Sequence, residues 1–364
     1  MRSDSGPVGV TLHPPKRLSS NVAVSSPSIY DLAKELNVSV STVSRALSDH
    51  PSISQATKKR VTKLAQKHNY QLNQVAAALS KGHGNLIGVL VPHIDGYFFG
   101  TIVRGIETAA RQAGYHVLIC QSYENAELQR EALDTMLSAR VAGILTSMAL
   151  TTPNAEEFTQ VLKRGVPLVL FDRTITGLPA SAVVIDDYQG TYELTEHLLD
   201  QGARRIAHLA GPQNQEIFRQ RLRGYQDALL ARGLTPDPAL VYPEGLYIEG
   251  GVAGMAQLLA LPQPPDAVLS ATDFAAIGAL QALKQRGLRV PDDMLLTGFG
   301  NELMSAYMDP PLTTVNQRNE QMGEAAVQLL INALEKTTGP VPDRFVLRPE
   351  LIIRQSSQRP TPPA

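Results

Sequence analysis

The sequence predicts an α/β protein in which a small helical head precedes a larger body of doubly wound parallel sheets. Its 364 residues, 43% of them hydrophobic and 18% charged, are sufficient for two or three compact domains. Apolar residues recur at helical spacing from Ser28 to His68. From Leu86 the pattern changes to continuous apolar strands separated by amphipathic helices, which indicates parallel sheets covered on both faces.

Charge is distributed unevenly between the head and the body. Residues 1–85 contain 11 Lys and Arg and 4 Asp and Glu, whereas the remaining residues contain 22 and 30. A basic head on an acidic body indicates that the head contacts a polyanion and that the body does not.

The cysteine content and the apolar runs indicate the compartment. The single cysteine, Cys120, excludes an internal disulfide and fits a reducing environment, and its place in the apolar run YHVLIC predicts a buried core thiol. No apolar run approaches the ~20 residues that a membrane helix needs, and no apolar segment follows Arg2 as it would in a signal peptide. We therefore expect a cytoplasmic protein with no membrane partner.

The head is predicted to contain three short helices. Ser28 caps the first helix, with Asp31 near its positive end, and Ser39 and Ser54 cap the second and third helices. The second helix carries small hydroxyl side chains and one arginine on its outer face. A helix with such a face, joined to another helix by a tight polar turn, is typical of proteins that read the major groove of DNA.

The segments around the head and after the body differ in composition from both. Residues 1–27 and 355–364 are rich in Ser, Pro, Gly or Gln, and are predicted to be disordered. Residues 73–85 form a predicted hinge, in which the run NQVAAALS at 73–80 favours helix. Because isolated helices below ~12–15 residues are marginal in water, this one is expected to form only when a partner holds it.

The body is predicted to consist of two lobes. Amphipathic helices such as Phe99–Ala113, Tyr188–Asp200 and Gln220–Arg232 lie between the strands, and about 270 residues are too many for one sheet. Ligands bind such folds at the carboxyl ends of the strands. The predicted strands are Leu86–Val91, Tyr115–Cys120, Gly143–Thr146, Leu168–Phe171, Val183–Ile185, Ile206–Ala210, Ala267–Leu269 and Leu295–Thr297.

Four segments together resemble the LacI/GalR family of bacterial transcription regulators. They are SIYDLAKELNVSVSTVSRAL, KHNYQLNQVAAALSKG, IGVLVPHIDGYFF and TDFAAIGALQALKQRGLRVPDDMLLTGF, and the resemblance covers about residues 28–354. It implies a homodimer in which each subunit presents a helix-turn-helix to one half of a pseudo-palindromic operator. It also implies a periplasmic-binding-protein-like body that binds a small effector and needs no cofactor.

The resemblance also implies domain boundaries. The helix-turn-helix domain is residues 28–72, the hinge helix and linker are 73–85, and the effector-binding and dimerisation domain is 86–354. Within this domain the first lobe is about 86–185 and 318–343, and the second lobe is about 186–317 and 344–354. Nothing after Ile353 could form the heptad-repeat helix that joins some relatives into tetramers, so a dimer is expected.

Within this resemblance, the DNA contacts fall on the second predicted helix and its surroundings. Val40 and Ser41 match the main base-reading positions, and Val40 is expected to contact a thymine methyl group. Leu79 matches a leucine that relatives insert into the minor groove, whereas Leu72 stands where many relatives have proline, so coupling through the hinge is expected to be looser. The other implied contacts are Tyr30, Ser39, Thr42, Ser44, Arg45 and Asn73. The alternatives are that the hydroxyls only cap the helix and that Leu79 joins the dimer interface.

The implied effector site combines arginines with aromatic side chains, which take paired hydroxyls and cover a sugar ring. The alternatives are lobe core for the two phenylalanines, a surface ion pair for Arg221 and a helix cap for Asp273. The implied residues are Phe98, Phe99, Arg173, Arg221, Tyr247 and Asp273.

Gly300 departs from the family pattern, because relatives commonly carry an aspartate there that accepts bonds from ligand hydroxyls. Asn301 or Glu302 could substitute for it, and the chain contains no tryptophan to cover a sugar. The effector therefore remains open between a sugar, a sugar acid or phosphate, a nucleobase and a corepressor protein.

Two other classes of function compete with an effector-controlled repressor. A solute-binding receptor would carry a signal peptide and would have no use for Ser28–Leu47. An enzyme is not indicated, because no Gly-rich phosphate loop follows a body strand and neither a metal-ligand cluster nor a serine elbow is present in the sequence. The sequence therefore predicts a DNA-binding regulator.

Overall fold

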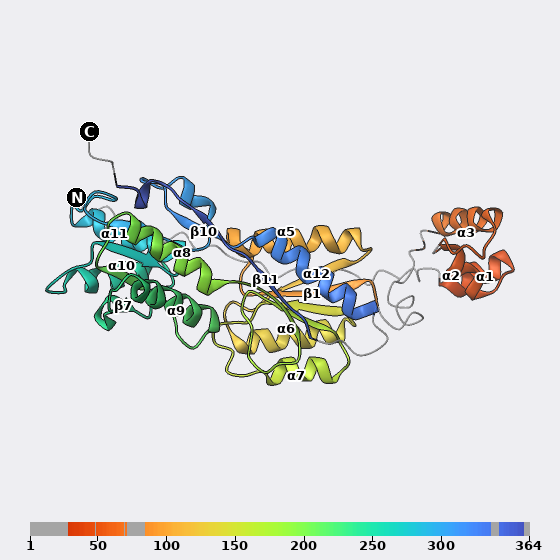
Figure 1. Ribbon diagram of the computed structural model, residues 1–364. Coiled ribbons are helices and arrows are strands. Elements are labelled where there is room, and N and C mark those ends of the chain that lie inside the picture. The colour runs from red at the N-terminus through yellow and green to blue at the C-terminus, as the bar shows by residue number, and fades with distance from the viewer. Residues whose placement is uncertain (1–27, 48, 69, 71–83, 336–341, 360–364) are drawn as a thin grey trace, which may run out of the picture. The chain divides into compact units, whose positions relative to one another are not determined.

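A computed structural model describes residues 28–47, 49–68, 70, 84–335 and 342–359 of the chain (Figure 1). The chain divides into two compact units, a head within Met1–Ser80 and a body within Lys81–Ala364. The predicted N-terminal extension, the end of the predicted tail and nearly all of the predicted hinge lie outside the described residues. No helix in the described ranges is long and apolar enough to cross a membrane.

The head contains α1 (Ile29–Leu36), α2 (Val40–Leu47) and α3 (Gln55–Lys67). Leu32, Val43 and Val61, one from each helix, are almost completely buried and form its small core. The predicted caps are confirmed. Ser28 and Asp31 form a reciprocal capping box on α1, and the hydroxyls of Ser39 and Ser54 accept the backbone N–H groups of Thr42 and Thr57.

The first lobe of the body is a six-stranded parallel sheet with strand order β11-β5-β4-β3-β1-β2. Helices α5 (Tyr97–Gln112) and α12 (Asn319–Glu335) cover one face, and α6 (Ala126–Ser138) and α7 (Glu156–Lys163) cover the other (Figure 1). The strands are β1 (Leu86–Val91), β2 (His116–Gln121), β3 (Gly143–Thr146), β4 (Leu168–Phe171), β5 (Ser181–Ile185) and β11 (Arg344–Leu347).

The second lobe is a four-stranded parallel sheet with strand order β7-β6-β8-β9. Its core lies on both faces, as the continuous apolar strands predict. One face is covered by α8 (Asp187–Asp200) and α9 (Glu216–Ala231), and the other by α10 (Ile248–Leu259) and α11 (Asp273–Gln285). The strands are β6 (Ile206–Leu209), β7 (Val241–Tyr242), β8 (Ala267–Ser270) and β9 (Leu295–Thr297).

Three chain segments connect the two lobes. The first joins β5 to α8, and the other two pair as the antiparallel strands β10 (Thr314–Asn316) and β12 (Glu350–Ile352). The expected second lobe included residues 344–354, but the structure differs: Arg344–Leu347 pair with Ala182–Ile185 of β5. Residues 344–347 therefore belong to the first sheet, because their backbone hydrogen bonds complete its edge.

Two further expectations differ from the structure. Cys120 is half-buried rather than in the core, because it lies in the edge strand β2. The predicted disordered tail begins too early, because Gln355–Ser357 form the 3-10 helix η3, in which Ser356 and Ser357 are buried. The Ser356 hydroxyl donates to the Leu296 carbonyl at 2.6 Å, which fixes this segment beside β9.

Helices α5 and α12 cross at backbone contact because glycines face each other. A Cβ atom added to Gly105 would overlap the Glu320 carbonyl, and one added to Gly323 would overlap the Ile102 carbonyl. This crossing joins residues more than 200 positions apart and completes the first lobe.

We expect Gly105→Ala to lower the free energy of unfolding by about 1–3 kcal/mol, because the methyl group forces the two helix backbones apart. Gly100→Ala in the same helix is the control, because its Cβ would lie at an ordinary 3.6 Å from the Ile94 carbonyl. That change should stabilise the helix by about 0.5–1 kcal/mol. Thermal unfolding followed by circular dichroism separates the two, and equal effects would contradict the close crossing.

Candidate DNA-reading helix and effector cleft

Helix α2 directs the predicted reading residues away from the core of the head. Val43 and Ala46 are buried on its inner side. On the outer side, Ser41 and Arg45 are exposed and Val40, Thr42 and Ser44 are half-buried. Tyr30, at the start of α1, is 71% exposed. Asn73 and Leu79 lie outside the described residues.

The hydroxyl groups at the start of α2 form a connected cluster. The Ser39 Oγ lies 2.8 Å from both the Ser41 Oγ and the Thr42 Oγ1, and it accepts the Thr42 N–H at 3.1 Å. Ser39 therefore caps the helix, which is the alternative role that the sequence analysis gave to these hydroxyl groups. Helix N-termini combine free N–H groups with the positive end of the helix dipole, so this cluster can bind a phosphate group.

A cavity of about 350 Å³ opens between the two lobes of the body, and the six implied effector residues all line it. They come from the first turn of α5, the end of β4, helix α9, the residue before α10 and the start of α11. The structure therefore brings together residues that are up to 175 positions apart in the sequence. Among the described residues, no group of three His, Cys, Asp or Glu side chains could hold a metal ion.

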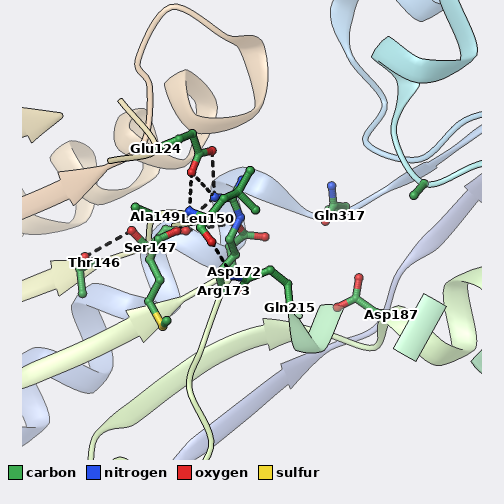
Figure 2. A network of polar contacts seen from close by, with 12 residues as sticks. Glu124, Thr146, Ser147, Ala149, Leu150, Asp172, Arg173, Asp187, Gln215 and Gln317 are labelled. Carbon is green, nitrogen blue, oxygen red and sulfur yellow. Dashed lines mark hydrogen bonds and ion pairs between the residues drawn. The ribbon is translucent and has the colours of Figure 1, made fainter. Parts of the chain in front are cut away.

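Arg173 presents donors to this cavity while an acid holds one end of its guanidinium. Its Nη1 donates to the two carboxylate oxygens of Glu124 at 2.7 and 2.9 Å and to the Met148 carbonyl at 3.1 Å. Its buried Nε has no hydrogen-bond partner among the described residues and pairs only with the Asp172 carboxylate, at 3.8 Å. Figure 2 shows the Glu124–Arg173 pair with its dashed contacts, and Asp187 and Gln317 apart from it. Arg173 therefore retains a buried donor, which a ligand acceptor could satisfy.

Arg221 is more fully engaged by the protein. Its Nε donates to Asp187 at 2.8 Å, its Nη1 to the Ala271 carbonyl at 2.6 Å, and its Nη2 to Gln317 at 3.3 Å. The guanidinium carbon lies 3.7 Å from the centre of the Phe299 ring. The ion pair is buried rather than on the surface. Burial raises the pKa of Asp187 to about 6, although the Arg221 charge opposes this shift.

Asp273 lines the cavity, but its carboxylate accepts three hydrogen bonds from the chain. The Glu302 N–H and the Ser305 hydroxyl donate to its Oδ2 at 2.7 and 2.6 Å, and the Thr314 hydroxyl donates to its Oδ1 at 2.6 Å. The helix cap itself is Thr272, whose side chain accepts the Ala275 N–H. Asp273 therefore fixes the loop after β9, and burial raises its pKa.

At the position without an acid, Gly300 adopts a φ of +135°, a region that favours glycine. Asn301 accepts a hydrogen bond from Arg354 at 2.8 Å and is not among the residues lining this cavity. Glu302 does line it and is 9% exposed. Of the two residues that could substitute for the missing acid, the structure places Glu302 in the cleft.

Sequence reasoning missed several cavity residues. Glu124 and Asp172 follow β2 and β4, so the rule that ligands bind at the carboxyl ends of strands could have identified them. Phe218 and Phe299 carry no such signal, because nothing in a sequence shows which phenylalanine faces a cleft. The residues that line the cavity without having been predicted include Glu124, Asp172, Phe218, Phe274, Phe299 and Gln317.

Two models of protein families match the chain. Residues 28–73 match the family described as bacterial regulatory proteins, lacI family, and residues 195–357 match the periplasmic binding protein-like domain. The transcriptional repressor CytR of Escherichia coli K12 is 34% identical over 328 residues, which are 90% of this chain and 95% of the relative.

Solved structures are similar over nearly the whole chain. The lac repressor dimer bound to operator and the anti-inducer ONPF has a TM-score of 0.80 at 27% identity, covering 92% of this chain and 99% of that one. The complex of the transcriptional regulator CelR with cellobiose has a TM-score of 0.69 at 30% identity, covering 91% and 99%. The first structure contains operator DNA and the second contains a sugar.

The buried Asp187 predicts a pH-dependent contribution to stability. Its pKa is about 6 in the folded chain and 3.8 in the ordinary state, so between these values the folded state binds more protons. The stability that Asp187 contributes is therefore present below about pH 4 and falls as the pH rises towards 6.

Asp187→Asn retains an acceptor for Arg221 and removes this titration. We expect the free energy of unfolding of the wild type, minus that of the variant, to decrease from pH 4 to pH 6 and to level off above pH 7. Glu244→Gln, an exposed acid of the second lobe, is the control. Urea unfolding at each pH measures the difference, and a constant value across the window would contradict the prediction.

Proposed function

Because the chain belongs to the LacI family of bacterial regulatory proteins, we propose that it is a homodimeric repressor controlled by a small polar effector in the cleft between its lobes. The chain is a DNA-binding transcription regulator and not an enzyme. The observation that carries the effector proposal is the cavity of about 350 Å³ that Arg173 lines, with an Nε that makes no hydrogen bond among the described residues and only a 3.8 Å ion pair with Asp172. We place the protein in the cytoplasm, where its operator would be.

The charge of the cleft favours an uncharged effector, such as a neutral sugar or sugar derivative. The acids that line it are Asp95, Glu124, Asp172, Asp273 and Glu302, against the guanidinium groups of Arg173 and Arg221. Asp95 is exposed and the other four are buried or half-buried, and the excess of carboxyl groups over guanidinium groups repels a second anion. This argues against a sugar acid or a sugar phosphate as the effector, although the two arginines considered alone would favour such an anion. The transcriptional regulator CelR forms a complex with the sugar cellobiose, which supports the same class of effector here.

A nucleobase, or a molecule that contains one, is the second candidate. Five of the eight phenylalanines of the chain line this one cavity, together with Tyr247. They are Phe98, Phe99, Phe218, Phe274 and Phe299. Aromatic faces stack on flat rings as well as on the apolar face of a sugar, so this lining supports both classes.

The DNA-binding half of the proposal rests on α2 and on pairing of two subunits. Val40, Ser41, Thr42, Ser44 and Arg45 would read one half of a pseudo-palindromic operator, with Tyr30 and Ser39 on the phosphates. Asn73 and Leu79 would contact the centre of the site from the hinge. The lac repressor bound to its operator as a dimer supports this arrangement.

The test begins with operator selection from random duplexes by the full-length protein. Thermal-shift screening then compares neutral sugars, nucleosides and nucleobases with sugar acids and sugar phosphates, and operator affinity is measured with and without each hit. We expect a neutral hit that changes operator affinity and a steep loss of affinity between ~50 and ~200 mM salt. Binding of anionic sugars alone would contradict the proposed effector class, and failure to select any operator would contradict the regulator.

We expect Arg173→Lys to weaken binding of the screened hit by about 10- to 100-fold, because lysine keeps the charge beside Glu124 but lacks the buried Nε donor. Arg219→Lys is the control, because Arg219 lies on the same lobe as Arg221 but pairs with Glu216 outside the cavity. Titration calorimetry measures both. Equal affinity for Arg173→Lys and the wild type would rule out ligand contact by this side chain.

Apolar side chains on the second lobe support a dimer. Leu303, Met304 and Tyr307 lie in or directly after the 3-10 helix η2 (Leu303–Ala306), and they are 57%, 59% and 81% exposed. We expect Tyr307→Glu to shift the protein from dimer to monomer, because burying the new charge at an interface is costly. Leu230→Glu on α9 alters an apolar residue that is 57% exposed and should leave the dimer intact. Sedimentation velocity reports the result, and a dimeric Tyr307→Glu would place the interface elsewhere.

A further inference from the structure

A loop of the first lobe contacts the second lobe beside the effector cavity. The loop is residues 147–152, which follow β3, and its partner in the second lobe is Gln215, the residue before α9. The Gln215 side chain is buried, and its Nε2 donates to the Leu150 carbonyl at 3.2 Å. Both residues belong to the network in Figure 2, together with Glu124 and Arg173. One hydrogen bond therefore joins the two lobes across 65 positions of sequence.

Apolar packing accompanies this hydrogen bond. The Leu150 side chain packs against a cluster of second-lobe residues, Ile217, Phe218 and Ala271, each of which is at most 9% exposed. Ile217 and Phe218 also line the effector cavity, whereas Leu150 and Gln215 do not. The contact between the lobes therefore adjoins a wall of the cavity without being part of it.

The loop is fixed to the rest of the first lobe at several residues. The buried Gln129 of α6 accepts the Ala149 N–H at 2.7 Å and donates to the Thr152 hydroxyl at 2.8 Å. The Thr151 hydroxyl donates to the Glu124 carbonyl, between β2 and α6, at 2.8 Å. Because these bonds join the loop to its own lobe, a second-lobe group that binds the loop holds the whole first lobe.

Glu124 connects the loop with the effector cavity. Its Oε2 accepts the Leu150 N–H at 2.8 Å, and both carboxylate oxygens accept the Arg173 Nη1. Glu124 and Arg173 both line the cavity. The same carboxylate therefore holds a cavity arginine and the residue whose carbonyl binds Gln215.

We propose that Gln215 is a positioning residue for the effector: with Leu150 it forms a latch that holds the two lobes together beside the cavity, and Glu124 links this latch to Arg173. The inference rests on the proposed function only in taking this cavity as the effector site.

The latch gives a bound molecule a route to the contact between the lobes. A ligand acceptor that binds Arg173 competes with Glu124 for its donors, and Glu124 is also the acceptor for the Leu150 N–H. An effector that binds the latched arrangement more tightly than the open one shifts the protein towards it, and the reverse preference opens it. Neither Gln215 nor Leu150 needs to touch the effector for this effect.

The distance between the lobes tests the latch in the full-length protein without any effector. In a Cys120→Ser background, spin labels at the exposed positions Lys163→Cys on α7 and Gln285→Cys on α11 report one distance distribution by double electron–electron resonance. Labelled chain is diluted with unlabelled chain so that only distances within one subunit are measured. We expect Gln215→Met to shift or broaden the distribution, because methionine is an unbranched side chain of similar length that has no N–H donor.

Two further variants separate the latch from a general loss of packing. Gln213→Met is the matched control, because Gln213 lies two positions away and donates to the Ala210 and Gly211 carbonyls within its own lobe. It should leave the distribution unchanged. Leu150→Ala removes the apolar part of the contact but keeps the backbone carbonyl, and we expect it to change the distribution in the same direction as Gln215→Met.

Glu124→Gln tests the connection to the cavity, because glutamine keeps an acceptor for the Leu150 N–H but loses the charge that pairs with Arg173. We expect a change in the same direction as that of Gln215→Met, and little further change when the two are combined, because both act on one contact. Glu127→Gln, which removes an exposed acid of the same lobe, is the control.

The outcomes distinguish the latch from the proposed function. An unchanged distribution with Gln215→Met, or an equal change with Gln213→Met, would overturn the latch. An unchanged distribution with Glu124→Gln would overturn its link to the cavity. Because no effector is used, the lack of a hit in the ligand screen would count against the proposed function and not against the latch.

Discussion

The buried guanidinium of Arg221 is the interaction on which the cleft depends. It projects from α9 and binds Asp187, which follows the first crossing between the lobes, and Gln317, which lies in the second. Its third contact is the Ala271 carbonyl at the end of β8. Removing one partner of such a buried pair costs roughly 3–5 kcal/mol, because an uncompensated charge remains. One side chain therefore ties two of the three connecting segments to the second sheet.

Asp273 fixes the loop after β9, just as Arg221 fixes two of the segments that connect the lobes. Three donors of the chain occupy its carboxylate, and the loop that they fix positions Glu302 and Gly300. Two residues that the family pattern assigns to the effector thus also build the walls of the site. Arg173 of the first lobe and Glu302 of the second both line the cavity, and neither stands at the position where relatives carry their acid. A cleft of this kind can keep its shape while its specificity changes.

The sequence predicted those elements whose signal is local. The bounds of β1, β3, β4 and β9 follow from continuous apolar runs, and the caps of the head follow from serines at fixed offsets. β11 escaped prediction because three of its four residues are exposed and give no buried pattern. The two side chains that Arg221 binds, Asp187 and Gln317, lie 34 and 96 positions away. Contacts between residues so far apart in the sequence depend on how the lobes pack together, and the hydrophobic periodicity of a sequence does not predict this packing.

The position of α12 and β11 in the first lobe bears on how the protein is made. Helix α12 packs against α5 through Gly105 and Gly323, and β11 forms the edge of the first sheet, yet both follow all four strands of the second sheet in sequence. Chains emerge from the ribosome from the N-terminus and fold by domains as they do so. The first lobe must therefore wait, with one face of its sheet covered by α5 alone, until residues 319–347 have been added. The helices of the head meet no such delay, so on the nascent chain a formed DNA-reading unit precedes any completed effector site.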